Sequence, residues 1–329
     1  MPDLAIVGLG RIGSSYDAEP APLPRSHVGA ALAAQGFRIR WLIDPDGDAR
    51  ARARAQWSQL IDAAWLPSID ALPAGEVDVI ALCTPPAGRS KEIEKAIELE
   101  ARVVIAEKPF CRTANEAIRL AALTQKAGIA VRVNFHRRLD PGHLRMKALC
   151  AGVPHKVIFR YGKGLYNYGS HAIDMLLDWF GPVEFVQAID DRRGEDPSLS
   201  IRCRFRAGFD AYLLGIDDLG YDQFDVDFFF ADRRIELSNG GVDRRLYRAI
   251  RDKYYPGYVH LELDERAADS SQVGGLAELY ASVCDHLEKG TTLQGCTAAD
   301  AAAGLAVLET ALRSRDEGGS LLEVSAPLS

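Results

Sequence analysis

The sequence predicts an α/β fold in which a doubly wound parallel sheet is followed by an α+β region with an antiparallel or mixed sheet. From residue 3 to about 135, short apolar segments alternate with helical patterns. Apolar runs rich in β-branched residues are typical of strands buried on both faces of a parallel sheet. After about residue 150, strand-like segments follow one another across short turns. A chain of 329 residues can form two cores, so we predict domains at residues 1–135 and 136–329.

The elements of the first domain follow from these patterns. Strands are expected at residues 4–9, 37–44, 77–84, 101–107 and 130–135, and helices at 26–36, 48–57, 89–100 and 113–128. The last helix has the clearest boundaries, because Thr113 and Glu116 match a capping box and Gly128 follows its end.

The second domain is expected to hold more strands than helices. Its strands are predicted at residues 155–162, 183–189, 199–205, 210–216, 224–230 and 233–238, and its helices at 169–181 and 274–290. A further helix should begin at Thr297, with Asp300 completing its cap, and run to about residue 315. Its leucine stripe makes it a candidate to pack back on the first domain.

The composition narrows the class of protein. A net charge of −7 argues against nucleic acid as the main partner. No apolar run approaches the roughly 18 residues of a membrane span, and a buried-strand pattern at Leu4 argues against a signal peptide. The six cysteines are scattered and form no CxxC pair. They indicate reduced thiols of a cytoplasmic protein without a disulfide framework or a metal site.

A glycine pattern follows the first expected strand. Gly8, Gly10 and Gly13 match G-x-G-x-x-G directly after apolar residues, which is the context that a Rossmann dinucleotide-binding loop requires. The first glycine permits a tight turn, the second lets the backbone approach the pyrophosphate, and the third lets helix and strand pack closely. The pattern predicts a nicotinamide dinucleotide bound by these glycines and by Arg11 and Ile12 between them.

The segment after this loop departs from the usual spacing. Asp44 ends the second strand, where an acid binds the adenosine ribose, yet it lies 44 − 13 = 31 residues after Gly13 instead of about 20. Residues 14–25 therefore form an insertion, and the helix should resume near Ser26. We expect the insertion at the mouth of the active site, with Tyr16 and Asp17 as candidate ligand contacts. A surface excursion without function is the alternative.

Asp44 also bears on the choice of cofactor. Its carboxylate would accept hydrogen bonds from the ribose hydroxyls and repel a 2′-phosphate, which favours NAD over NADP. Arg11 could neutralise such a phosphate and keeps NADP as the alternative. Asp44 lies in the sequence DPDGD, so a plain turn residue is its other interpretation.

Two side chains suit hydride transfer from an alcohol. Lys108 stands at the carboxyl end of an expected parallel strand, where open α/β sheets bind ligands, and its charge would stabilise a developing alkoxide. His171 lies in the first turn of a predicted helix, and histidine as a residue type suits proton exchange near neutral pH. Asp174 shares its helix face and would orient the imidazole. An exposed lysine and a structural histidine are the alternatives.

Four segments occur in a characteristic order: GLGRIG after the first strand, AEKPF after a later one, RRLDP soon after it, and GSHAIDMLLDWFG at the start of the second domain. Together they resemble the Gfo/Idh/MocA oxidoreductases over nearly the whole chain. The resemblance implies an N-terminal Rossmann domain and a C-terminal domain with an open, mostly antiparallel sheet. It implies that the outer face of this sheet is used to form a homodimer or homotetramer.

The resemblance also implies roles for individual residues. Lys108 matches the catalytic lysine and His171 the catalytic histidine. Thr84 and Pro85 would flank the dinucleotide, and Glu107 would lie with Lys108 beside the nicotinamide. The substrate contacts expected on this basis, together with the insertion, are Tyr16, Arg138, Asn167, Tyr168 and Asp174.

The expected activity is NAD(P)-dependent oxidation or reduction of a secondary alcohol or ketone of a sugar, sugar derivative or nucleotide-sugar. One departure matters, since many relatives carry aspartate where this chain has Asn167. Asparagine cannot take up a proton, which argues against a Lys–Asp–His relay. The alternatives are an NAD-binding regulator without turnover and an enzyme that uses tightly bound NAD transiently.

Overall fold

The computed structural model describes residues 1–17, 19 and 21–325, which form two units. The first unit comprises Met1–Asp140 and Gly274–Ala302, and the second comprises Pro141–Val273 and the described residues from Ala303 on. The sequence placed the boundary five residues earlier (140 − 135) and assigned all of 274–302 to the second domain. That assignment was wrong because periodicity locates a helix but does not say which core receives it. Leu279 and Tyr280 of this segment belong to the core of the first unit.

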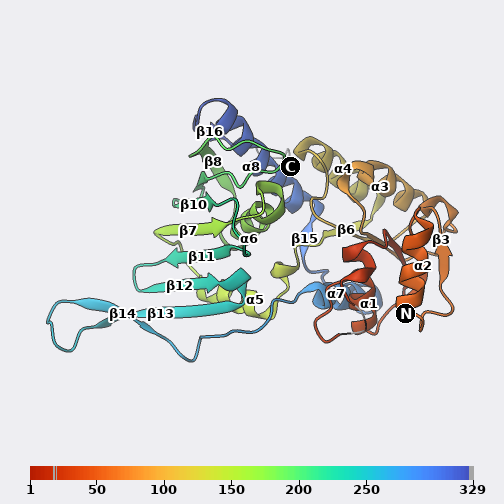
Figure 1. Ribbon diagram of the computed structural model, residues 1–329, viewed down its shortest axis with the longest axis horizontal. Coiled ribbons are helices and arrows are strands. Elements are labelled where there is room, and N and C mark those ends of the chain that lie inside the picture. Colours follow the sequence, from red (N-terminus) through yellow and green to blue (C-terminus); the bar gives the residue numbers. More distant parts are fainter. Residues whose placement is uncertain (18, 20, 326–329) are drawn as a thin grey trace. The chain divides into compact units, whose positions relative to one another are not determined.

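The first unit is built on a parallel sheet with the order β15-β6-β5-β4-β1-β2-β3 (Figure 1). Strands β1 to β6 are parallel, and β15 pairs with β6 in the antiparallel sense. Strand order reverses beside β1, which is where doubly wound sheets bind dinucleotides. The strands are β1 (Asp3–Val7), β2 (Arg38–Ile43), β3 (Ala64–Leu66), β4 (Val79–Leu82), β5 (Val103–Ala106), β6 (Ala130–Val133) and β15 (Cys296–Thr297).

The helices of this unit begin and end where the cap residues predicted. The Thr113 hydroxyl accepts a hydrogen bond from the Glu116 backbone, and Gly128 ends the helix with φ 73°, so the N-cap and the end of the helix are confirmed. The Glu116 carboxylate accepts from the Arg112 backbone. Thr297 and Asp300 exchange two hydrogen bonds of 3.0 and 3.1 Å at the start of α8. The helices are α1 (His27–Ala33), α2 (Gly47–Gln56), α3 (Arg89–Glu98), α4 (Ala114–Ala127), α7 (Leu276–Lys289) and α8 (Ala298–Asp316), and α8 continues into the second unit.

The second unit holds a sheet with the order β14-β13-β12-β11-β7-β10-β9-β8-β16. Only β7 and β10 pair in parallel among its described strands, so the expected mostly antiparallel sheet is confirmed. Its strands are β7 (Lys156–Tyr161), β8 (Val183–Ala188), β9 (Ile201–Phe205), β10 (Asp210–Gly215), β11 (Phe224–Phe229), β12 (Arg233–Ser238), β13 (Asp243–Arg251), β14 (Val259–Leu263) and β16 (Leu322–Glu323). The helices α5 (Pro141–Leu149) and α6 (Ser170–Phe180) accompany them.

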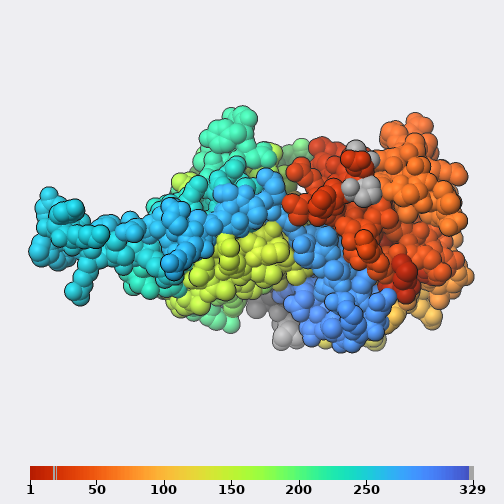
Figure 2. Space-filling model, turned by 90° about the horizontal axis from the view of Figure 1, so that it is seen from below, coloured from red at the N-terminus to blue at the C-terminus, as the bar shows by residue number. Residues whose placement is uncertain are grey.

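The strands β13 and β14 were not predicted. They form a hairpin that extends beyond the neighbouring strands of the sheet (Figures 1 and 2). Arginines on both faces of β13 hide the alternation of apolar and polar residues on which strand prediction depends. Residues of β14 are mostly exposed, so they too lack a buried face that a pattern could reveal.

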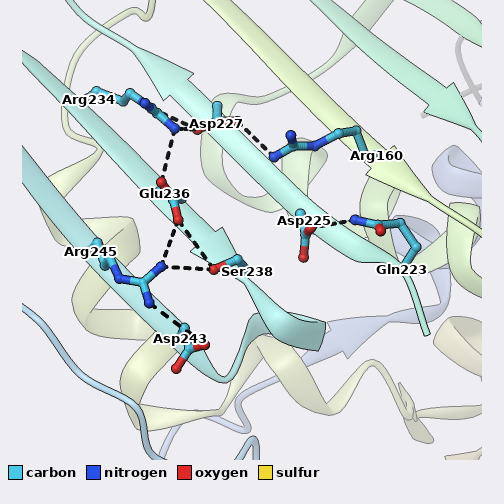
Figure 3. A network of polar contacts seen from close by, with 9 residues as sticks. All are labelled: Arg160, Gln223, Asp225, Asp227, Arg234, Glu236, Ser238, Asp243 and Arg245. Atoms are coloured by element: carbon cyan, nitrogen blue, oxygen red, sulfur yellow. Dashed lines mark hydrogen bonds and ion pairs between the residues drawn. The ribbon is translucent and has the colours of Figure 1, made fainter. Parts of the chain in front are cut away.

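The outer face of this second sheet carries a network of ion pairs between arginines and carboxylates (Figure 3). Asp227 accepts from Arg160 at 3.0 Å and from Arg234 at 2.8 Å, and Glu236 accepts from Arg234 at 3.0 Å and Arg245 at 2.8 Å. Each of these two carboxylates is thereby neutralised by two arginines. Oligomerisation through this face stays a prediction.

All six cysteines are free thiols. In the described part of the chain, no helix has the length and apolar character needed to cross a membrane.

Candidate functional site

The glycine loop has the geometry of a dinucleotide cradle. Gly8 has φ 92°, and a Cβ there would lie 3.1 Å from the Cys83 carbonyl. A Cβ on Gly13 would lie 1.9 Å from the Gly8 oxygen, so packing excludes any side chain. A Cβ on Gly10 would meet no described atom within 4 Å. The loop is therefore closed on the protein side and open beside Gly10, which fits close approach of a pyrophosphate.

Asp44 stands next to this loop, as the motif requires. Its Oδ2 accepts a hydrogen bond of 2.7 Å from the Leu9 backbone N–H, and its Oδ1 accepts one of 2.9 Å from Asp46. The second bond is the turn role that the sequence left open, so Asp44 both shapes the turn and faces the glycine loop. Arg50 donates to the Asp44 carbonyl at 2.5 Å.

The insertion after Gly13 differs in part from its expected form. A helical turn at Arg11–Ser15 contains the third glycine of the loop and the first two residues of the insertion. Helix α1 begins at His27 with Ser26 as N-cap. The prediction that the helix resumes near Ser26 is confirmed. The predicted contact of Asp17 with a ligand is not supported, because this residue is 6% exposed. Its Oδ2 accepts from the Ser26 backbone at 2.7 Å and from the Ser26 hydroxyl at 2.6 Å.

Tyr16, the other candidate contact of the insertion, is 47% exposed, and the Arg11 guanidinium lies 4.9 Å from its ring centre. Its predicted substrate contact stays a prediction. The sequence could not separate these two neighbours, because only the fold shows which of them turns inward.

We expect the substitution Asp17→Ala to lower the free energy of unfolding by about 2 kcal/mol, since it leaves the buried backbone and hydroxyl donors of Ser26 and the partly buried backbone donor of Arg25 without an acceptor. Urea denaturation measures the change. Glu19→Ala in the same segment, where the side chain is exposed, is the matched control. Equal effects of the two substitutions would argue that the Asp17 contacts add nothing.

The loop after β4 is held by a buried arginine. Arg89 is fully buried and donates to the Thr84 carbonyl at 2.9 Å and to the Phe110 carbonyl at 3.1 Å. It also pairs with Glu92 at 3.0 Å, and the Thr84 hydroxyl donates to the same carboxylate. Arg89 thus ties the loop that holds Thr84 and Pro85 to the segment after β5. The sequence missed it, because an arginine at the start of a helix usually faces water.

Glu107 is held at the end of β5 by side chains from other elements. Its Oε1 lies 2.9 Å from His27 Nε2 and accepts from Asn134 at 2.6 Å, and its Oε2 accepts from the Lys108 backbone at 3.3 Å. Burial alone would raise the pKa of this carboxyl, but hydrogen bonds from His27 and Asn134 and the charge of Lys108 hold it below its ordinary value. Glu107 is therefore an anion at neutral pH.

The sheet brings the predicted cofactor residues together. The glycine loop follows β1, Asp44 follows β2, Thr84 follows β4, and Glu107 and Lys108 follow β5. These strands are parallel neighbours in the order β5-β4-β1-β2, so their carboxyl ends form one edge. Lys108 is half-buried there and precedes Pro109 through a cis peptide bond.

The second unit gathers the remaining candidates around the start of α6. His171 and Asp174 are 7% and 5% exposed on the first turns of this helix. Asn167 and Tyr168 lie in the helical turn before it. Asp196, which the sequence did not single out, accepts from the Asn167 backbone at 3.1 Å and fixes this turn.

Two neighbours of Tyr168 were also missed by the sequence. The Tyr168 hydroxyl donates to Asp222 at 3.0 Å, and Lys163 pairs with the same carboxylate. Asp222 lies 54 residues from Tyr168 in the sequence and Lys163 belongs to no motif, so sequence reasoning had no signal for either.

Arg138 makes an ion pair of 3.1 Å with Asp300 inside the first unit. This contact gives it a structural role at the start of α8, and its substrate contact stays a prediction. Lys108 and His171 belong to different units, so their joint action also stays a prediction.

Residues 3–135 match the GFO_IDH_MocA family model, described as an oxidoreductase family with an NAD-binding Rossmann fold. This match covers less than half of the chain, and it identifies the first unit as similar to the NAD-binding domain of that family. The uncharacterized oxidoreductase YrbE of Bacillus subtilis is 27% identical over 154 residues, which are 46% of this chain and 41% of that relative. The chain thus matches less than half the length of this curated relative.

Solved structures share the fold over both units. An oxidoreductase from Agrobacterium radiobacter, in complex with NAD+, L-tartaric acid and magnesium, has a TM-score of 0.77 at 17% identity and 99% coverage of both chains. The WlbA dehydrogenase from Bordetella pertussis, in complex with NADH and UDP-GlcNAcA, has a TM-score of 0.74 at 20% identity and the same coverage. At these identities the likeness shows the fold alone.

Proposed function

We propose that the protein is an NAD-dependent dehydrogenase that transfers hydride between nicotinamide and a secondary alcohol or ketone of a sugar, sugar derivative or nucleotide-sugar. One observation carries the proposal: an NAD-binding Rossmann domain presents its glycine loop, Asp44 and Lys108 at a single edge of its sheet. The solved structures with NAD+ and L-tartaric acid and with NADH and UDP-GlcNAcA support a polyhydroxylated substrate.

The chemistry divides between cofactor and protein. Bound NAD supplies the hydride acceptor or donor. Lys108 would stabilise negative charge on the substrate oxygen, and His171 would take or return the proton, with Asp174 on the same helix face orienting its ring. Asn167 would hydrogen-bond a substrate hydroxyl in place of a proton relay.

The cofactor contacts proposed are Gly8, Gly10, Arg11, Ile12, Gly13, Asp44, Thr84, Pro85, Glu107 and Lys108. The substrate contacts proposed are Tyr16, Arg138, Asn167, Tyr168 and Asp174. We also propose a cytoplasmic homodimer or homotetramer.

We expect the purified protein to bind NAD at least tenfold more tightly than NADP, because the Asp44 carboxylate would repel a 2′-phosphate. Calorimetric titration with each nucleotide measures the two dissociation constants. Asp44→Asn should reduce the ratio of the NADP to the NAD dissociation constant, because it removes the negative charge. Tighter binding of NADP would instead indicate that Arg11 neutralises its 2′-phosphate.

A substrate panel tests the activity itself. Absorbance at 340 nm is followed with NAD and a series of sugars, sugar acids, cyclitols and UDP-sugars. NAD binding without turnover on any compound would favour the regulator, which Asn167 alone supports at present. Stoichiometric NAD in the purified protein would instead favour transient use of a bound cofactor.

A further inference from the structure

A series of buried, hydrogen-bonded polar side chains ends at Glu107, the residue before Lys108. His27, on the first turn of α1, is fully buried, and its Nδ1 lies 2.8 Å from the hydroxyl of Tyr280, which is also fully buried. Its Nε2 lies 2.9 Å from Glu107 Oε1, to which Asn134 also donates at 2.6 Å. The chain Tyr280–His27–Glu107 therefore joins α7 and α1 to the end of β5. All of its members lie in the first unit.

The electrostatics of this chain favour a charged imidazole. Burial alone would lower the pKa of His27, but Cys83, Tyr280 and Glu107 around it raise this pKa well above its ordinary value. The imidazolium then donates through Nε2 to the Glu107 anion. A buried charge pair of this kind is costly to break from one side, because the partner is left uncompensated.

The backbone around Lys108 is fixed on both sides. Before Lys108, the Glu107 carboxylate is held by hydrogen-bond contacts with His27 and Asn134. After it, the Phe110 carbonyl accepts a hydrogen bond of 3.1 Å from buried Arg89. Lys108 is thus presented from a short rigid segment, as a group that must meet a bound ring accurately should be.

The sheet topology indicates which part of the cofactor would meet Glu107. Asp44 at β2 marks the adenosine side, and the glycine loop at β1 marks the pyrophosphate. A dinucleotide that spans the edge then places its nicotinamide on the far side of β1, toward β4 and β5.

We propose that His27 is a positioning residue that compensates the charge of Glu107 beside the nicotinamide and thereby sets the preference of the site for NADH over NAD+. The oxidised ring is a cation and the reduced ring is neutral. A Glu107 anion left without its imidazolium would attract the cation, whereas the intact pair is neutral overall. This inference rests on the NAD site of the proposed function.

The test compares His27→Gln with the unmodified protein. Glutamine keeps an N–H donor for Glu107 but carries no charge. Dissociation constants for NAD+ and NADH are measured by calorimetry and by NADH fluorescence, with thermal unfolding as a check on the fold. We expect the ratio Kd(NADH)/Kd(NAD+) to rise about threefold or more, as an uncompensated charge within the same cleft requires. Tyr280→Phe, which retains the imidazole and Glu107, is the matched control and should leave the ratio within a factor of about 1.5.

His27→Asn, also neutral, serves as the second variant if the glutamine variant does not fold. A parallel weakening of both nucleotides in the folded variant would show a merely structural role and overturn the proposal. An unchanged ratio would overturn it as well. Failure of the unmodified protein to bind either nucleotide would instead overturn the proposed function.

Discussion

The substitutions His171→Ala and Lys108→Met should each reduce kcat by about 10²- to 10⁴-fold, the usual cost of losing one acid–base or charge-stabilising group. Binding of NAD should persist, because neither change touches the glycine loop or Asp44. The measurement is kcat with the best substrate of the panel, together with the NADH dissociation constant from fluorescence. Turnover would then be separated from cofactor binding.

Matched controls exist for both changes. His155→Ala removes an exposed histidine of the second unit, and Lys126→Met removes an exposed lysine near the end of α4. Both should retain normal turnover. Near-normal kcat in the His171 and Lys108 variants would end the assignment of these residues as catalytic.

The largest expected loss of stability follows the substitution Arg89→Met. The side chain is fully buried, and its removal leaves the carbonyls of Thr84 and Phe110 and the Glu92 carboxylate without their donor. Breaking a buried charge pair from one side costs about 3–5 kcal/mol, so urea denaturation should show a change of that size. NAD binding should also weaken, because Arg89 fixes the loops after β4 and β5 at the cofactor edge.

The control for this prediction is Arg119→Met. Arg119 is half-exposed and pairs with Glu94 at 3.7 Å on the surface, so its loss should cost less than about 1 kcal/mol. If the Arg89 variant were as stable as this control, the buried contacts would carry no net weight.

The sequence located those elements whose signals are local. Buried parallel strands, the Thr113 and Asp300 caps and the resumption of α1 at Ser26 all depend on residues within a few positions of one another. The glycine loop and Asp44 were found because a dinucleotide imposes a fixed chemical pattern on the chain.

The missed features depend on contacts between distant segments. His27 and Tyr280 are 253 residues apart in the sequence, and each occupies a helix position that looks like ordinary core. Asp17 was read as a ligand contact because only its partners at Arg25 and Ser26 reveal its use. Because the contacts that place residues 274–302 in the first unit also join distant segments, the sequence did not reveal them.

The insertion includes a residue that joins it to the start of α1. Asp17 folds back onto the start of α1, and Gly29 makes room for it, since a Cβ there would lie 2.4 Å from the Asp17 carboxylate. Asp17, Ser26 and Gly29 thus hold the insertion against α1, and Gln56 and Trp57 hold its first residues through Ser14 and Asp17. A relative with an uninterrupted first helix should accept the whole segment when these five residues are transferred with it. The position after the cofactor loop of this fold therefore tolerates insertions, so that evolution or protein design can add residues there beside the expected reaction centre.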